Sequence, residues 1–212
     1  MTRGRGRHTT RAVGRPSNTE ERRAQIVDAL GMVMAREGYE RATIAAIAKR
    51  AGLAPGLVHY HFEDKGEILV ALVERIVSGL EARVTARLAA AAPGARAHLH
   101  ALVDAHVALG DDADPNAVAM WAAVAAEAMR RPEVRALYKN AISATLARLE
   151  RLVRAAMREA GKPTRDAKAI AAAISSAIEG AYLVHVSAPG VLPRGYAAPA
   201  LHALVDGILG PG

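Results

Sequence analysis

The chain has 212 residues, of which 51% are hydrophobic and 3% aromatic; it carries a formal net charge of +7 and contains no cysteine. The absence of cysteine excludes disulfides and thiolate metal sites, and it is compatible with a reducing cytoplasm, where we expect the protein to reside. No uninterrupted apolar run approaches the roughly 18 residues of a membrane-spanning helix, so no membrane partner is expected. The alanine-rich composition favours helices over a large sheet and predicts an all-α fold.

The first segment of the chain is a basic arm. Residues 1–18 contain five arginines, of which Arg15 is the last, and no acidic residue, whereas residues 19–65 have equal numbers of acidic and basic residues. Such an arm is typical of proteins with a polyanionic partner, which is nucleic acid or an anionic membrane surface. Of these two we expect nucleic acid and no membrane, and the alternative is a solubilising tail. Its "RGRGR" and "VGRPS" resemble the Gly-Arg-Pro core of AT-hooks, which bind narrow minor grooves. A non-specific phosphate-binding arm is the favoured interpretation.

Helices are predicted along the rest of the chain from capping residues and from Pro, Gly and Asp at the loops. The first begins at Asn18 or Thr19 and ends at Gly38, and a short helix capped by Thr43 follows. Asp64 and Glu67 form a capping box that opens a long helix reaching about Ala90. Further helices are expected at about 95–109, 115–130, 133–160, 165–187 and 196–209.

Between the first helix and the long helix, the sequence contains a helix-turn-helix pattern. Gly52 can adopt the left-handed conformation that the turn needs, and Pro55 suits the first turn of the next helix, which ends near residue 61. We expect this helix to pack its apolar residues inward and to expose its polar rings to phosphates and base edges of DNA. The inward residues are Leu53, Val58 and Phe62, and the exposed rings are those of His59, Tyr60 and His61.

Two other interpretations of these rings exist. A shared metal site for His59 and His61 is disfavoured, because residues i and i+2 of a helix lie about 200° apart, and no metal is expected. An ordinary amphipathic helix that packs on its neighbours is the second alternative.

Residues 19–69 resemble the DNA-binding domain of the TetR family of bacterial transcriptional regulators. The matching elements are Gly38-Tyr39, "ATIAAIAKRAGLAPG" and "HYHFEDKGEIL". The resemblance implies an all-α homodimer, with an N-terminal three-helix DNA-binding domain and a larger helical bundle domain that binds a small effector and forms the dimer. Carried over residue by residue, it implies that Thr43, Tyr60, His61 and Lys65 hold phosphates and that Pro55, Gly56 and His59 approach bases or backbone.

The sequence departs from the family pattern in the recognition region. Ala54 stands where many members have serine, a natural N-cap, and the loss of a cap typically costs about 1 kcal/mol. Leu57 occupies a position that is often Thr in the family but apolar in its BetI-like subgroup. The resemblance therefore does not imply which operator sequence is read.

The C-terminal segment "MWAAVAAEAMRRPEVRALYKNAISATLARLERLV" resembles the BetI-like subgroup, the choline-responsive repressor and its relatives. Apolar stripes on the last two predicted helices predict a four-helix interface across a two-fold axis, with an intramolecular core as the alternative. The residues predicted at this interface are Ile170, Ile174, Ile178, Leu201, Leu204, Val205 and Ile208.

An effector cavity is predicted around Trp121, the one tryptophan of the chain. Aromatic faces combined with a carboxylate favour an organic cation, and a largely apolar acyl ligand is the alternative. The residues predicted at the cavity are Met120, Trp121, Glu127, Tyr138, Glu179 and Tyr182.

These features predict a ligand-responsive transcriptional repressor that binds an inverted-repeat operator in double-stranded DNA. We divide it into an arm (1–18), a DNA-binding domain (19–65) and an effector and dimerisation domain (66–212). An architectural DNA-binding protein is one alternative. An enzyme is another, in which Glu127 and Glu179 would pair as a carboxylate dyad. No P-loop, Gly-x-Ser-x-Gly or His-Glu-x-x-His motif is present, so no catalysis and no cofactor is expected.

Overall fold

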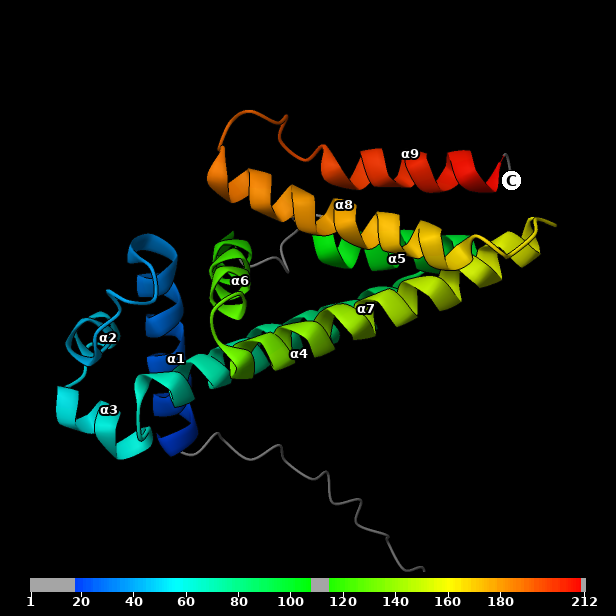
Figure 1. Cartoon of the computed structure of the whole chain (residues 1–212). Helices are drawn as coiled ribbons and strands as arrows, with labels where there is room; N and C mark the ends of the chain where they lie inside the picture. Colours follow the sequence, from blue (N-terminus) through cyan, green and yellow to red (C-terminus); the bar gives the residue numbers. More distant parts are fainter. Residues whose placement is uncertain (1–17, 108–114, 211–212) are drawn as a thin grey trace, which may run out of the picture.

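The computed structural model describes residues 18–107 and 115–210, and the predicted all-α fold is confirmed (Figure 1). Each predicted helix is present, with ends that differ from the expected ones by a few residues. The predicted basic arm, including Arg15, lies outside the described residues. The helices are α1 Asn18–Glu37, α2 Ile44–Ala51, α3 Pro55–His61, α4 Lys65–Ala90, α5 Ala95–Val107, α6 Pro115–Ala128, α7 Pro132–Glu159, α8 Ala167–Ser187 and α9 Ala197–Leu209.

Capping contacts define the helix-turn-helix at one end of the molecule. The Thr43 hydroxyl accepts a hydrogen bond from the backbone N–H of Ala46 (3.1 Å) and so begins α2. Gly52 ends α2 with φ 67°, the left-handed conformation that glycine adopts without steric cost. Asp64 accepts from the backbone N–H of Glu67 (2.9 Å), and Glu67 in turn accepts from the backbone N–H of Glu63 (2.8 Å). The capping residues predicted for these helices, namely Thr43, Gly52, Asp64 and Glu67, therefore cap them in the structure.

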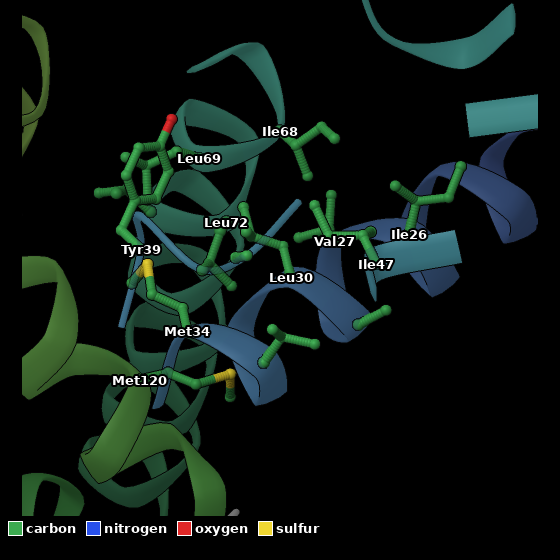
Figure 2. Close-up of a cluster of buried hydrophobic side chains, with 14 of the residues drawn as sticks. Ile26, Val27, Leu30, Met34, Tyr39, Ile47, Ile68, Leu69, Leu72 and Met120 are labelled. Atoms are coloured by element: carbon green, nitrogen blue, oxygen red, sulfur yellow. The ribbon is translucent and has the colours of Figure 1, made fainter. Parts of the chain in front are cut away.

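A first hydrophobic core joins α1, α2 and α3 to the beginning of α4 and to α6 (Figure 2). Leu30 and Ile47 are completely buried in it, and Met120 of α6 packs against α1. Gly31 permits this approach, since a Cβ at that position would lie 2.3 Å from the Met120 sulfur. The core thus crosses the predicted boundary at residue 65 and ties α6 to the helix-turn-helix.

A second core lies at the other end, among α5, α7, α8, α9 and the last part of α4. Leu102, Leu149 and Ile178 are among its most deeply buried side chains. The 26-residue α4 extends through both cores, a length of about 39 Å at 1.5 Å per residue. Figure 1 shows α4 and α7 running side by side away from the helix-turn-helix.

Helix α8 is unusually apolar for a surface element. In the part of the chain that the structure describes, it is the one helix long and hydrophobic enough, with a mean hydropathy of 1.5, to cross a membrane by length and composition alone. A core helix of a water-soluble protein passes the same test. One face of α8 contacts α5, α6 and α7, and the apolar character of its outer face is considered below.

Candidate functional site

The exposed surface of α3 is the first candidate site. His59 is exposed, and Tyr60 is 79% exposed. Pro55 begins the helix and Ala54 provides no side-chain cap, as predicted. Gly56 is exposed, and a Cβ there would meet no atom within 4 Å, so the helix start is open to another molecule. Thr43 is exposed as well, so these residues give α2 and α3 a polar surface that is open to solvent.

His61 corrects the prediction of three exposed rings. It is only 9% exposed, and its backbone carbonyl accepts a hydrogen bond from the Arg23 guanidinium. Residues three apart on a helix share a face, so His61 follows the fully buried Val58 inward. Phe62 is buried as predicted, with the Arg23 guanidinium 3.9 Å above its ring, and Leu53 is half-buried. His61 is therefore a packing residue.

Lys65 has partners inside the molecule. Its Nζ donates to the Tyr39 carbonyl (2.8 Å) and lies 4.1 Å above the centre of the Tyr39 ring. The Arg131 guanidinium lies 4.3 Å from the same ring and also contacts Glu40 (3.4 Å). Burial is the main cause of the raised pKa of Tyr39, which keeps its hydroxyl neutral. The phosphate contact predicted for Lys65 stays a prediction.

Glu127 completes this arrangement and corrects a second prediction. Its carboxylate is buried and accepts from Nε of Arg131 (3.3 Å), so it points toward the corner between α6 and α7 and away from the effector cavity. The contacts described so far join five residues at this corner: Tyr39, Glu40, Lys65, Glu127 and Arg131. Since Glu127 is held here, the enzyme-like pairing with Glu179 is absent from the described residues.

The second candidate site is a cavity of about 660 Å³ with walls from α1, α4, α5, α6, α7 and α8. Four predicted residues, Met120, Trp121, Glu179 and Tyr182, line it. Tyr138 does not, but its ring stacks on Trp121 with centroids 4.7 Å apart. The sequence interpretation missed the cavity residues of α4 and α5, chiefly Arg75, Arg83 and His106. The eight-residue spacing of Arg75 and Arg83, with Gly79 halfway, was the available signal, because i+4 residues share a helix face.

A fixed carboxylate forms one pole of the cavity. Oε2 of Glu179 accepts from Nε1 of Trp121 (3.1 Å) and from the Tyr138 hydroxyl (2.9 Å). Burial raises the pKa of Glu179, and the two hydrogen bonds oppose that rise. Burial, followed by the charge of Glu179, raises the pKa of Tyr138 and keeps its hydroxyl a donor. Tyr138 thus lies outside the cavity lining and orients two residues that do line it: its hydroxyl donates to Glu179, and its ring stacks on Trp121.

The other pole is formed by Arg83, His106 and Tyr182. The Tyr182 hydroxyl donates to the His106 carbonyl (2.7 Å). Burial, and then the charges of Arg83 and Arg148, lower the pKa of His106 to about 4, so its imidazole is neutral at physiological pH. Nε of Arg83 is buried without a hydrogen-bond partner. The cavity therefore has a negative and a positive pole.

The outer faces of α8 and α9 are exposed and apolar, and they lie side by side in Figure 1. Leu183 is 61% and Leu204 59% exposed, and small residues such as Ala173, Ala177 and Gly180 lie beside them. Most of the predicted interface residues point the other way. Ile174, Ile178, Leu201 and Val205 are buried in the second core, Ile170 and Ile208 are half-buried, and Leu204 alone is exposed.

Similarity to known proteins agrees with this architecture. Residues 95–210, more than half of the chain, match the family model described as BetI-type transcriptional repressor, C-terminal, and residues 26–72 match that of bacterial regulatory proteins, tetR family. The chain belongs to the TetR family. This membership confirms the resemblance carried by the helix-turn-helix and by the α6–α7 segment. It also places the protein among transcriptional regulators and not among enzymes.

Individual relatives of this TetR-family protein include regulators named BetI. The HTH-type transcriptional regulator BetI of Rhizobium meliloti is 32% identical over 195 residues, which cover 88% of this chain and 92% of that protein. That of Paraburkholderia phymatum is 35% identical over 118 residues, and the match spans only 60% of its length. A transcriptional regulator from Saccharomonospora viridis, solved in complex with choline, has a TM-score of 0.73 at 24% identity, covering 89% of this chain and 95% of that one. At that identity the likeness shows the fold alone.

Proposed function

We propose that this protein is a dimeric repressor whose affinity for operator DNA is controlled by a small molecule in the cavity. One observation carries the proposal: Trp121 lines the cavity and also belongs to the core that positions the helix-turn-helix. A ligand that contacts Trp121 therefore touches the packing that sets the orientation of α3. The BetI relatives are named as transcriptional regulators, which supports the same role for this chain. Its proposed location is the cytoplasm.

The DNA contact is assigned to the exposed surface of α2 and α3. Thr43 and Tyr60 are placed to hold phosphates, and Pro55, Gly56 and His59 to reach bases or backbone in the major groove. The basic arm with Arg15 adds phosphate contacts. Arg41, which is exposed in the loop just before Thr43, is a further phosphate ligand that the sequence interpretation did not include.

The dimer is assigned to the outer faces of α8 and α9. Leu183 and Leu204 are large apolar side chains exposed on these faces, and exposed apolar patches mark sites where a partner protein binds. Small side chains on α8 allow a second copy of the same helices to approach closely, in a four-helix arrangement about a two-fold axis. A two-fold dimer reads a two-fold site, so the operator is expected to be an inverted repeat.

The effector class that fits the negative pole is an organic cation. Glu179 offers a carboxylate fixed by two hydrogen bonds, and the cavity lining includes the aromatic side chains of Trp121 and Tyr182, a residue type that attracts ammonium groups. The choline complex of the Saccharomonospora viridis regulator, which shares the fold, supports this assignment. A largely apolar acyl compound is the competing ligand class.

Helix α6 is the proposed route from the cavity to DNA. Its Trp121 borders the cavity, its Met120 fills the space above Gly31 of α1, and its Glu127 holds Arg131 against Tyr39. An effector that prefers a shifted α6 selects a conformation whose α3 helices no longer match the half-site spacing.

The test is a binding titration by fluorescence anisotropy on the DNA that flanks the gene of this protein, with and without choline. Tight, salt-sensitive binding that exceeds binding to random duplex, and that choline weakens, supports the proposal. Equal affinity for specific and random DNA would instead indicate an architectural DNA-binding protein. Release by an octanoate titration but not by choline would support the acyl alternative.

A further inference from the structure

Arg83 is a charged residue of the cavity for which an organic cation supplies no partner. It lines the cavity from α4, and its Nε is buried without a hydrogen-bond partner. Within residues 18–107 and 115–210, no hydrogen bond or ion pair reaches its guanidinium. Arg83 is half-buried, and arginine is charged at every physiological pH. A buried polar group such as its Nε is costly to leave without a hydrogen-bond partner.

Two other arginines in this region, Arg75 and Arg148, each pair with a carboxylate through two guanidinium nitrogens. Arg75, also at the cavity wall, makes a two-pronged ion pair with Asp28 (2.7 and 2.9 Å). Arg148 makes a similar pair with Glu81 (2.7 and 3.2 Å). Arg83 is unlike both, because its complementary anion is not supplied by any described residue.

The groups around Arg83 do not neutralise it. The His106 imidazole is uncharged at neutral pH, and the Tyr182 hydroxyl already donates to the His106 carbonyl. A choline-like cation bound alone would be repelled by the guanidinium and would leave its donors unused. A carboxylate, in contrast, matches the planar guanidinium with two parallel hydrogen bonds.

The two poles, Glu179 and Arg83, belong to one cavity of about 660 Å³. Among the described residues no ion pair joins Glu179 to Arg83: the partners of Glu179 are Trp121 and Tyr138, and Nε of Arg83 has none. Tyr182 lines the same cavity three residues after Glu179 on α8, and the charges of both Glu179 and Arg83 act on its pKa, in opposite directions. One ligand in this cavity therefore has a carboxylate and a guanidinium among the groups that surround it.

We propose that the effector is a zwitterion, with an alkylated ammonium against Trp121 and Glu179 and a carboxylate paired with Arg83. The inference rests on the proposed function only in taking the cavity as the effector site. It narrows the ligand class from organic cations to compounds that also carry an anionic group a few bonds away. The acyl alternative corresponds to an anion that satisfies Arg83 but leaves Glu179 without a counter-charge.

Three probes separate these classes: choline, N,N,N-trimethylglycine and butyrate. Choline and trimethylglycine share the trimethylammonium group, but choline has a hydroxymethyl group where trimethylglycine has a carboxylate. Binding to the full chain is followed by calorimetry and by the fluorescence of Trp121. We expect trimethylglycine to bind roughly tenfold to hundredfold more tightly than choline, because a hydrogen-bonded charge pair contributes that factor, and we expect butyrate to bind weakest.

Variants assign the preference to Arg83. Arg83→Met keeps the length of the side chain, removes the charge, and is expected to make choline and trimethylglycine bind equally. Arg83→Lys retains the charge without the planar fork and is expected to keep part of the preference. Arg75→Lys is the control for the lysine variant, because it keeps a cation beside Asp28 at the wall of the same cavity, and it should leave the preference unchanged. Melting curves confirm that each variant is folded.

The outcomes separate the inference from the proposed function. If choline binds as tightly as trimethylglycine to the unaltered protein and releases operator DNA, the zwitterion inference is wrong and the proposed function stands. If Arg83→Met retains the full preference for trimethylglycine, the role of Arg83 is wrong. If neither ammonium compound binds while the protein still binds its operator, both the inference and the cation class are overturned.

Discussion

Glu179→Gln tests the negative pole with minimal disturbance of the fold. The amide oxygen of glutamine can still accept from Trp121 and Tyr138, so the two hydrogen bonds that hold this side chain can persist. What changes is the charge. A cation about 5 Å from the carboxylate gains about 3 kcal/mol at an effective dielectric constant of about 20. Because Glu179 is partly exposed, solvent screening reduces this gain to about 1.5–3 kcal/mol, or roughly tenfold to hundredfold in affinity.

The assay is calorimetric titration of choline and trimethylglycine into the unaltered protein and the Glu179→Gln variant. Acidification should have the same effect as the substitution. Burial raises the pKa of Glu179, so its carboxylate takes up a proton at a higher pH than usual, and affinity for cations should fall as the pH falls through that raised pKa. The variant should show no such pH dependence above the range in which His106 of the same cavity, with its pKa lowered to about 4, takes up its own proton.

The stability of the variant checks the same electrostatics. An acid whose pKa is raised in the folded state destabilises the fold when it is ionised, and the protein regains this stability as the pH falls through the raised pKa. Glu179→Gln is therefore expected to melt at the same or a higher temperature at neutral pH. Unchanged affinity for both cations in a folded variant would refute the assignment of Glu179, and a gain in octanoate binding would favour an acyl effector.

Three further predictions concern DNA and the dimer. Tyr60→Phe should weaken binding to specific and random DNA alike without changing Tm, whereas His59→Ala should lower the specific-to-random preference by roughly 1–3 kcal/mol; unchanged binding in both would remove α3 from the interface. Deleting residues 1–17 should flatten the slope of log affinity against log salt by about one unit for each phosphate that the arm neutralises, and an identical slope would mean that the arm is only a tail. Leu183→Glu with Leu204→Glu should give monomers by light scattering, and a surviving dimer would place the interface elsewhere.

The helices could be predicted because their ends carry local signals. The Asp64 and Glu67 capping box, the left-handed Gly52 and the N-cap Thr43 are determined by neighbours within a few residues, so sequence alone indicates them. Helical spacing could also have predicted that His61 is buried and that Glu127 points away from the cavity, two points that the sequence interpretation missed. His61 shares the face of Val58, and Glu127 lies six residues, or about 240°, from Trp121 on α6.

The interface and the positive pole required the tertiary structure. The sequence indicates that α8 is apolar on several sides, but not that Ile174 and Ile178 pack inward while Ala173 and Ala177 face outward. Likewise, many arginines lie on the predicted long helix. That Arg83 faces the cavity without a carboxylate partner depends on the packing of α5, α7 and α8 around it.

Ligand and operator are proposed to prefer different conformations of the same chain, and thermodynamic linkage between the two binding events tests this proposal. Trp121 is the one tryptophan, so its fluorescence reports on the cavity. The ligand is titrated while this signal is followed, first with free protein and then with protein saturated by operator DNA. We expect operator to lower ligand affinity by the same factor by which ligand lowers operator affinity. Equal ligand affinity in the two titrations would show that the cavity and the DNA-binding surface are not coupled.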